Sequence, residues 1–487
     1  MILATIPYAR LDPGNALARA YLVEPERVLP LFARDYRDPR GLKRLAQQQR
    51  ARPRPPLGAI LSAYNRDVGG SVENAARLDD ALCVVSGQQA GLLFGPAYTT
   101  YKLFTCINAA RTLETELGTP VVPVFWVETE DHDWEEVNRF DLPGRRLKLD
   151  AAVEPGTPVA GVEADAAPFL AAVRAELGGE DAAWGIVAPE RGVARWHVRN
   201  LARLVEGSGV VFLEPHLLRE PMRAFAGRIA ASAEAIDDSL RADTGFPRRL
   251  EPPDGAYLFD AGDGRRRRAP RGAPVPFAWS SDVAARVLVQ NAALPALMAV
   301  CGPSEIQYWA QLNGAHEALG VPMPAVLPRN AATLVEAGPF RDAARLGLGL
   351  EELVLGTTSP PEIPRDRDPV AARLSGLATE ARELLSALEA GTLPLPANTE
   401  KPFRRTVTRL EEDLARLAGR LDEARADAEG VGRQRYERLL EALRPRGTLQ
   451  ERVYSLFPFL ARQGPGLAAR LREAFDPFEF GHYLVRA

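Results

Sequence analysis

Short apolar runs alternate with helical segments over much of the first 345 residues. The runs at 81–85 and 121–127 are entirely hydrophobic, and a polar loop follows each one. Such runs are typical of strands that are buried on both faces of a parallel sheet. Pro96 stands between them where a helix can begin, and the alternation returns at 275–345. The pattern predicts an α/β fold whose polar loops gather at one edge of the sheet, where open sheets bind ligands.

Residues 365–444 follow a different pattern, in which apolar residues recur at steps of four and three. This spacing predicts a helical hairpin with coiled-coil seams, interrupted at 391–402. Each seam covers about three heptads, which is short for an isolated coil. The two helices therefore pack on each other, on the core or on a second subunit. The seam positions are Val370, Leu374, Leu377, Ala381, Leu384, Leu388, Leu410, Leu414, Leu417, Leu421 and Ala424.

These patterns divide the chain into parts. The predicted boundaries are 1–150 for the N-terminal part of the core, 151–274 for an inserted connecting segment that includes a strand at 210–213, 275–345 for the second part of the core, 346–445 for the coiled-coil hairpin, and 446–487 for a segment that returns to the core.

The loop after the first strand combines glycines with polar side chains. Glycine lets the backbone turn tightly and approach a ligand closely, while amides, hydroxyls and an ammonium donate hydrogen bonds. The loop suits phosphate or carboxylate, although its spacing is neither of the common phosphate-loop motifs. An ordinary strand-to-helix turn is the alternative. The loop residues concerned are Ser86, Gly87, Gln88, Gln89, Gly91, Gly95, Tyr98, Thr99 and Lys102.

An acidic cluster surrounds His132 after the second strand. Such crowding could bind a divalent cation, orient an amine, or hold the imidazole protonated for acid–base chemistry. The alternative is a solvated loop whose carboxylates face the positive end of a helix. The cluster consists of Glu130, Asp131, Asp133, Glu135 and Glu136, with Asn138 following.

A third polar group follows Cys301. Gly302 starts a turn that can open a helix, and Glu305, Tyr308 and Gln311 then share one face of it. That face, together with Arg286, could bind an amine, a hydroxyl or a carboxylate. A capped helix that packs Trp309 in the core is the alternative.

Composition limits the possible partners. The net charge of -4 argues against broad nucleic-acid binding, and the run Arg265–Arg268 fits a charged hairpin tip better than an anion site. The longest apolar stretch, 294–301, is far short of the roughly 20 residues that cross a bilayer. The N-terminus lacks the basic flank of a secretory signal, so we expect a cytoplasmic protein.

The three cysteines, Cys83, Cys106 and Cys301, are odd in number and widely spaced. They form no C-x-x-C pair, so they indicate neither a structural metal nor a disulfide framework.

Four blocks of sequence together resemble one known family. They are SGQQAGLLFGPAYTTYK at 86–102, PVVPVFWVETEDHDWEEVN at 120–138, CGPSEIQYWAQL at 301–312, and PMP at 322–324 through Pro328 and Arg329, with further likeness at 447–452 and 457–460. In this order they closely resemble the bacillithiol biosynthesis cysteine-adding enzyme family, BshC. The resemblance covers nearly the whole chain.

The resemblance implies a ligase that joins the carboxyl group of cysteine to the amine of glucosaminyl malate, the last step of bacillithiol biosynthesis. It also implies a Rossmann-like core with inserted connecting segments, a coiled-coil domain that pairs two subunits into a homodimer, and a nucleotide, ATP or ADP. The chain lacks the class I synthetase signatures, so acyl phosphate and acyl adenylate both stay open as the activated form. The role of His216, where an acid is more usual, also stays open.

The site residues expected from these motifs fall into two groups. The expected catalytic residues are Lys102, Asp131, His132 and Asp133. The residues expected to bind substrate or nucleotide are Ser86, Gly87, Gln88, Gln89, Gly91, Gly95, Tyr98, Thr99, Asn138, Arg286, Gly302, Glu305, Tyr308 and Arg329, of which Arg286 or Arg329 would hold a malyl carboxylate. Two other functions fit the same residues: a nucleotidyl-transferase-like enzyme with another amine substrate, and a non-catalytic nucleotide-binding scaffold.

Overall fold

The computed structural model describes residues 2–11, 14–179, 181–359, 369–396 and 399–487. Its chain forms two compact units. The first unit comprises Met1–Ala337 and Leu443–Ala487, and the second comprises Gly338–Ala442.

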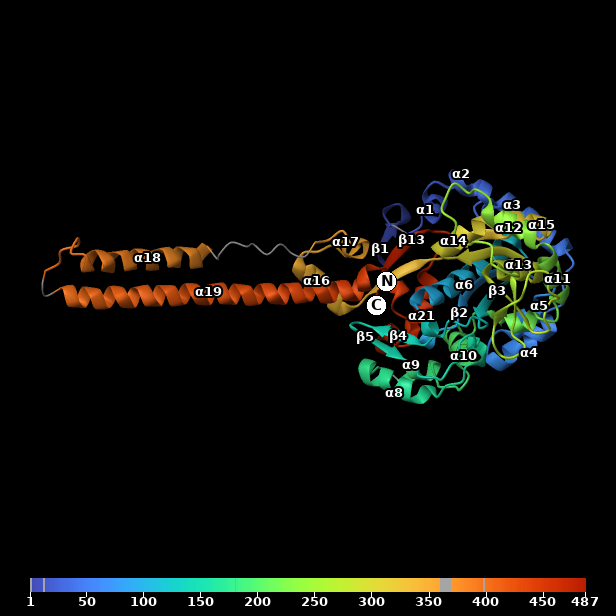
Figure 1. The fold of residues 1–487 in the computed structure, drawn as a ribbon, viewed down its shortest axis with the longest axis horizontal. Helices are drawn as coiled ribbons and strands as arrows, with labels where there is room; N and C mark the ends of the chain where they lie inside the picture. The colour runs from blue at the N-terminus through green and yellow to red at the C-terminus, as the bar shows by residue number, and fades with distance from the viewer. Residues whose placement is uncertain (1, 12–13, 180, 360–368, 397–398) are drawn as a thin grey trace. The chain divides into compact units, whose positions relative to one another are not determined.

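A five-stranded parallel sheet lies at the centre of the first unit (Figure 1). Its strands are β2 (Leu82–Gln89), β3 (Val121–Glu128), β6 (Val211–Leu213), β10 (Ala296–Cys301) and β11 (Ala325–Pro328), in the order β11-β10-β2-β3-β6. The chain builds outward from β2 to β3 and β6, and then returns to the other side of β2 to form β10 and β11. The strand order therefore reverses between β2 and β10, which is where open α/β sheets leave a crevice for ligands.

Apolar residues on both faces explain why these strands are buried. On β3, Val124 and Trp126 pack into one hydrophobic cluster, whereas Phe125 and Val127 pack into another. Successive side chains of a strand point to opposite faces, so each cluster covers one face of the sheet.

Helices fill the space around the sheet. They are α1 (Ala16–Val23), α2 (Pro25–Val28), α3 (Pro39–Ala51), α4 (Gly58–Val68), α5 (Val72–Arg77), α6 (Ala97–Leu117), α7 (Trp134–Val137), α8 (Ala166–Leu177), α9 (Asp181–Ile186), α10 (Val193–Leu204), α11 (Arg223–Ala231), α12 (Ala233–Arg241), α13 (Val283–Ala293), α14 (Pro303–Ala310), α15 (Asn313–Ala318), α20 (Phe457–Gln463) and α21 (Gly466–Ala474). Helix α16 (Ala337–Leu346) belongs, except for its first residue, to the second unit.

The strand predicted at 210–213 belongs to the central sheet. The sequence assigned residues 210–213 to the inserted segment, but β6 pairs in parallel with β3 at the edge of the central sheet. Its three residues are too few to show the long apolar run by which β2 and β3 were recognised.

A second sheet joins the two ends of the chain. Strand β13 (Gly481–Arg486) lies between β1 (Ile2–Pro7) and β12 (Ala331–Val335), antiparallel to β1 and parallel to β12. Smaller sheets are the hairpin β4 (Arg139–Leu142) with β5 (Arg145–Lys148), and β7 (Leu258–Asp260) between β8 (Arg267–Arg268) and β9 (Trp279–Ser281). Segment 446–487 thus belongs to the same unit as the central sheet.

The second unit contains two long antiparallel helices, α18 (Pro369–Glu389) and α19 (Glu400–Leu443), preceded by α17 (Leu350–Leu355). Their antiparallel direction is shown by ion pairs of Arg382 with Glu411 and of Arg404 with Glu389. Between them lie the buried residues Ala371, Ala378, Ala381, Leu388, Val407 and Ala418.

A second apolar stripe on these helices is left uncovered. Its members, Val370, Leu377, Leu384, Leu410 and Leu417, are 40–57% exposed. They recur every seven residues on each helix, which is the spacing of a coiled-coil seam.

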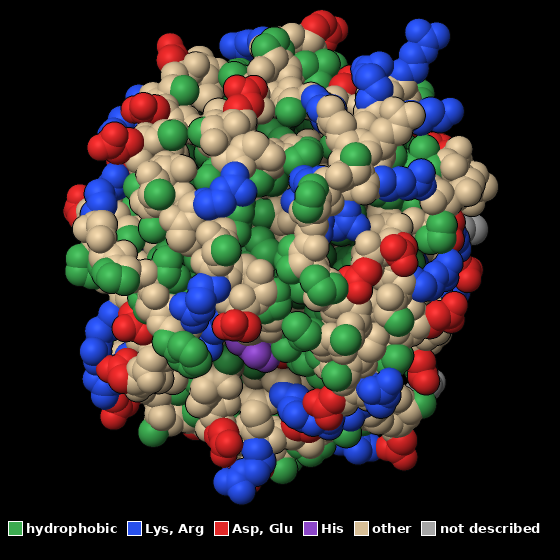
Figure 2. Space-filling view, turned by 90° about the vertical axis from the view of Figure 1, so that its right-hand side faces the viewer, with side chains coloured by type: hydrophobic (Ala, Val, Ile, Leu, Met, Phe, Trp, Pro, Cys, Tyr) green, Lys and Arg blue, Asp and Glu red, His purple; other side chains and the backbone are tan. Residues whose placement is uncertain are grey.

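Charges are mixed over the surface. Figure 2 shows one face, on which Lys and Arg side chains lie among Asp and Glu without forming a broad basic surface. Among the described residues, no helix is both long and apolar enough to cross a membrane.

Candidate functional site

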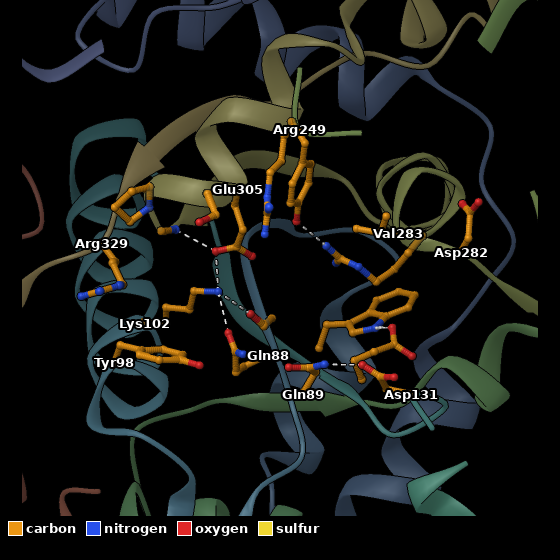
Figure 3. Close-up of a pocket in the computed structure, with 18 of the residues that line it drawn as sticks. Gln88, Gln89, Tyr98, Lys102, Asp131, Arg249, Asp282, Val283, Glu305 and Arg329 are labelled. Carbon is orange, nitrogen blue, oxygen red and sulfur yellow. Dashed lines mark hydrogen bonds and ion pairs between the residues drawn. The ribbon is translucent and has the colours of Figure 1, made fainter. Parts of the chain in front are cut away.

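A cavity of about 470 Å³, here called the main cavity, opens at the carboxyl ends of β2 and β10. This is the point where the strand order reverses. The structure brings most of the predicted site residues to its wall, namely Gly87, Gln88, Gln89, Tyr98, Lys102, Asp131, Arg286, Gly302, Glu305, Tyr308 and Arg329. Figure 3 shows these side chains converging from segments that are far apart in sequence.

Lys102 joins the ends of β2 and β10 (Figure 3). Its ammonium donates to the carbonyl of Gly87 and the amide oxygen of Gln88, both at 2.9 Å, and forms an ion pair with Glu305 at 2.5 Å. Burial lowers the pKa of Lys102, and the carboxylate of Glu305 opposes that effect. Glu305 also accepts the backbone N–H of Gly302 at 2.7 Å, which fixes the start of α14. The donors of Lys102 are therefore committed to protein groups.

The end of β2 is also tied to the loop after β3. Gln89 donates its side-chain amide to the carboxylate of Asp131. The other oxygen of Asp131 accepts the backbone N–H of His132 at 2.7 Å. Asp131 thereby holds the loop in one position and keeps its carboxylate at the cavity wall.

Arg329 lines the main cavity but is bound within the protein. Its guanidinium makes two hydrogen bonds to Glu451, at 3.0 and 2.5 Å, and both side chains are buried. The carboxylate of Glu451 raises the pKa of Arg329 despite the opposing effect of burial. The guanidinium carbon of Arg329 also lies over the ring of Tyr98, 5.6 Å from the ring centre. The charge of Arg329 is thus neutralised within the protein before any substrate arrives.

Four other arginines line the main cavity without a salt bridge to any carboxylate in the described parts of the chain. Arg452 lies where this cavity borders a second one, and we call the remaining three, Arg249, Arg266 and Arg286, the open cations. Arg286 donates only to neutral groups, to Gln290 at 3.2 Å and to the hydroxyl of Tyr308 at 3.0 Å. The open cations are available for anionic groups of a ligand.

Glu128, at the end of β3, is a carboxyl group that the sequence did not single out. Its carboxylate accepts the indole N–H of Trp126 at 3.0 Å. Burial raises the pKa of Glu128 to about 7, although the charges of Arg286 and Arg266 act to lower it. A carboxyl group with this pKa exchanges protons near neutrality, as an acid or base in a reaction must.

A second cavity, of about 170 Å³, adjoins the first and is lined by the glycine loop. Gly95 has a φ of +69°, and a Cβ on Gly91 would lie 2.9 Å from the Cα of Gly95, so the loop requires glycine at these positions. Four arginines line the second cavity, Arg139, Arg146, Arg446 and Arg452. Arg146 and Arg446 both form ion pairs with Asp141. Gln88, Gln89, Tyr98 and Arg452 line both cavities, so the two are adjacent. The loop residues Gly91, Gly95 and Thr99 belong to this second cavity.

Ser86 and Asn138 lie away from the walls of both cavities. The hydroxyl of Ser86 is buried and donates to the carbonyl of Val300 at 3.0 Å, which links β2 to β10. Asn138 is buried beside Glu135, to which it donates at 3.4 Å.

His132 and Asp133 are also outside both walls. Both are exposed, and the carboxylate of Asp133 caps α7 by accepting the backbone N–H of Glu136 at 3.3 Å. Their predicted catalytic role stays a prediction.

The arginine run at 265–268 forms the predicted charged hairpin only in part. Arg265 pairs with Glu154, Arg267 with Asp263, and Arg268 with Asp282. Arg266 instead lines the main cavity. His216 lies 3.8 Å from the carboxylate of Glu214, outside the walls of both cavities.

No cluster of three or more His, Cys, Asp or Glu able to hold a metal ion occurs among the described residues. The thiols of Cys83, Cys106 and Cys301 are buried, and burial raises their pKa. Burial in apolar surroundings makes a thiol inert, because the thiolate is the reactive form.

The chain matches two family models. The model described as bacillithiol biosynthesis BshC, N-terminal Rossmann-like domain, matches residues 1–219 and 273–330. The model described as bacillithiol biosynthesis BshC, C-terminal coiled-coil domain, matches residues 332–487. The predicted fold class, a Rossmann-like α/β core with a coiled-coil domain, is confirmed.

Curated relatives match over almost the full length. A protein of Symbiobacterium thermophilum is 32% identical over 97% of each chain. A protein of Heliobacterium modesticaldum is 29% identical, with 97% of this chain and 98% of the relative covered. Both are provisionally named cysteine ligase BshC. A solved structure, described in provisional terms as an arginyl-tRNA synthetase of Campylobacter jejuni, shares 10% identity over 80% of this chain and 97% of its own, with a TM-score of 0.26, and this weak likeness supports no conclusion.

Proposed function

Because the chain belongs to the BshC family of bacillithiol biosynthesis, we propose that it is a cysteine ligase. The reaction forms an amide bond between the carboxyl group of cysteine and the amine of glucosaminyl malate. This is the last step in making bacillithiol, and we place it in the cytoplasm.

The observation that carries the proposal is the charge arrangement of the main cavity. The open cations Arg249, Arg266 and Arg286 suit carboxylates, while Glu128 and Asp131 suit an ammonium group. Glucosaminyl malate carries both kinds of group, two carboxylates and one amine. A cavity with both signs of charge can hold this substrate in one orientation.

The amine must lose a proton before it attacks, because an ammonium nitrogen has no free electron pair. We propose that Glu128 or Asp131 orients the amine and receives that proton, since neither carboxylate forms a salt bridge within the described chain. Lys102 and Glu305 hold the ends of β2 and β10 in register around the reacting groups. His132 and Asp133 remain candidates for a supporting role from the exposed part of the same loop.

A carboxylate acylates an amine only after its oxygen has been converted into a better leaving group. A nucleotide such as ATP supplies that activation when bound. The second cavity fits its phosphates: the glycine loop gives close backbone approach, and Arg139 and Arg452 lack a salt-bridge partner in the described chain. Any divalent cation would take phosphate oxygens among its ligands, as magnesium commonly does.

We further propose that the second unit pairs two copies of the chain. The uncovered stripe has the heptad spacing of a coiled-coil seam, and its members Leu377, Leu384, Leu410 and Leu417 are 40–51% exposed. A second copy would bury it.

Mass spectrometry of a reaction containing cysteine, glucosaminyl malate and ATP tests the proposed activity. We expect a thiol product with the mass of the two substrates less one water. A product with cysteine and a different amine would favour the alternative transferase. If the wild-type protein binds nucleotide but forms no product with any amine, and alanine at Gln88, Lys102 or Arg286 leaves binding intact, the non-catalytic scaffold is favoured.

A further inference from the structure

We propose that Arg249 and Arg266 determine acceptor specificity by binding the carboxylates of the malyl group. The inference rests on the proposed ligase function and assigns part of its substrate recognition to two residues that no site motif contains. Both residues lie within 220–272, the segment that falls between the two stretches matched by the Rossmann-like family model.

Arg266 is held rigidly with its guanidinium at the cavity wall. It donates to the hydroxyl of Ser280 at 3.1 Å and to the carbonyl of Ser281. The guanidinium also lies over the ring of Phe259, 4.1 Å from its centre. These contacts orient the group through neutral hydrogen-bond partners, while the carboxyl groups of Glu128 and Asp282 act on its charge from beyond salt-bridge distance. A guanidinium prepared in this way is suited to a carboxylate, which it can bind through two hydrogen bonds.

Arg249 lines the same cavity and comes from an earlier part of segment 220–272. Its backbone N–H and that of Leu250 both donate to the side-chain oxygen of Gln311, at 2.9 and 3.0 Å, which fixes the loop at the end of α14. Figure 3 shows the Arg249 side chain extending into the cavity beside Glu305. Its side chain is exposed, so a ligand can reach it.

The chemistry of the two arginines selects for an acceptor with two carboxylates. Of the cations contributed by the matched segments, Lys102 and Arg329 are already paired with Glu305 and Glu451, whereas Arg286 contacts only neutral groups. The open guanidiniums of Arg249 and Arg266 add positive charge that an acceptor without carboxylates cannot bind. Specificity arises because an acceptor without carboxylates forgoes the charge-assisted hydrogen bonds to both groups.

The same segments offer matched controls. Arg248 is next to Arg249 but is exposed, lies outside the cavity wall, and pairs with Glu251 at 3.7 Å. Arg267 is next to Arg266 but is exposed and pairs with Asp263 at 2.7 Å. Replacing either control removes the same charge from the same segment without touching the cavity.

The test compares Arg249→Ala, Arg266→Ala, Arg248→Ala and Arg267→Ala. For each of the first two we expect the KM for glucosaminyl malate to rise about tenfold or more, with the KM for cysteine and most of kcat retained. With methyl glucosaminide, an acceptor that has the amine but no carboxylate, the KM should not change. The two controls should match the wild type throughout. Thermal melts confirm folding, and Arg266→Lys, which keeps the charge, should recover part of the affinity.

Isothermal titration with glucosaminyl malate alone separates this inference from the proposed function, because it requires no turnover. We expect the double variant Arg249→Ala with Arg266→Ala to lose at least a hundredfold in affinity. A wild type that binds glucosaminyl malate but forms no amide overturns the ligase proposal and leaves the carboxylate site standing. Wild-type turnover with unchanged affinity in the folded double variant overturns the inference, as does an equal loss for the acceptor without carboxylates.

Discussion

The cations of the main cavity form two groups that differ in what neutralises them. Lys102 and Arg329 are buried and paired with Glu305 and Glu451, and both connect segments of the chain that are distant in sequence. The open cations Arg249, Arg266 and Arg286 contact neutral groups or extend into the cavity. The first group holds the walls together, whereas the second group is available to ligands. Nearness to the cavity alone therefore does not identify a binding residue.

This difference predicts opposite results when each group is changed. Removing a partner of a paired cation should lower stability, because a buried charge is left uncompensated. Removing an open cation should lower substrate affinity and leave stability almost unchanged. The predictions below test this contrast, beginning with the largest expected effect on the free energy of unfolding.

Glu451→Gln should cause the largest loss of stability. It leaves the buried guanidinium of Arg329 without its carboxylate, which costs about 3–5 kcal/mol in comparable buried pairs. Denaturant unfolding measures the change. Glu336→Gln is the matched control, because Glu336 pairs in the same two-bonded way with Arg462 at the surface and should cost at most about 1 kcal/mol. Equal losses in the two variants would contradict the special role of the buried pair.

Glu128→Gln should increase stability above neutral pH. The folded-state pKa of about 7 lies above the ordinary value of 4.5. Folded protein therefore binds more protons between these values, and this group's contribution to stability falls as the pH rises from 4.5 to 7, by up to about 1.4 kcal/mol per pH unit. The glutamine variant has no ionisable group at this position, so its stability does not fall in this way. Unfolding measured at pH 5 and pH 8 should show a gain at pH 8 alone, and a gain of equal size at both would refute the shifted pKa.

The double variant Leu410→Glu with Leu417→Glu should convert a dimer into monomers. It places charges on the uncovered stripe, where a second copy would bury them at a cost of several kcal/mol. Light scattering gives the mass. Arg409→Glu with Arg416→Glu is the control, since both arginines are exposed and next to the stripe positions. A wild-type monomer, or an unchanged dimer in the leucine variant, would show that the stripe does not join two subunits.

Arg286→Gln should leave the free energy of unfolding within about 0.5–1 kcal/mol of the wild type, since its hydrogen bonds go to the neutral groups of Gln290 and Tyr308 and Glu128 can take up a proton when the charge is removed. Its affinity for glucosaminyl malate should fall about tenfold or more. Denaturant unfolding and isothermal titration measure the two quantities on one preparation. A stability loss as large as that of Glu451→Gln would remove the distinction between the two groups of cations.

His132→Ala should have the smallest effect on stability, below about 0.5 kcal/mol, because the side chain is exposed. If the acidic loop takes part in catalysis, product formation should nevertheless stop. Asp133→Asn tests the same loop and keeps the cap on α7, because asparagine caps a helix about as well as aspartate. Full product formation by both variants would remove these residues from the mechanism.

Sequence patterns were sufficient for much of this architecture. Long apolar runs located β2 and β3, and polar residues at their carboxyl ends located the main cavity, because parallel strands deliver their ends to one edge. Periodicity located the helices of the second unit. It did not distinguish the residues buried between the two helices from the uncovered stripe, since both sets are apolar and recur at helical spacing.

The pairing of charges was beyond the sequence. Glu451 meets Arg329 across 122 residues, and neither belongs to a motif that names its partner. Arg266 belongs to a run of four arginines. Only the fold determines that Arg266 lines the cavity and that the other three form ion pairs elsewhere. For His132, the acidic surroundings indicated chemistry, but the direction of the loop is set by the cap that Asp133 forms on α7.

The most direct test of the contrast is a crystal structure with glucosaminyl malate bound. The account predicts malyl carboxylate oxygens within hydrogen-bond distance of Arg266 and of Arg249 or Arg286, with Arg329 still paired with Glu451 and Lys102 with Glu305. Carboxylates bound instead to Lys102 or Arg329, with those ion pairs broken, would contradict it.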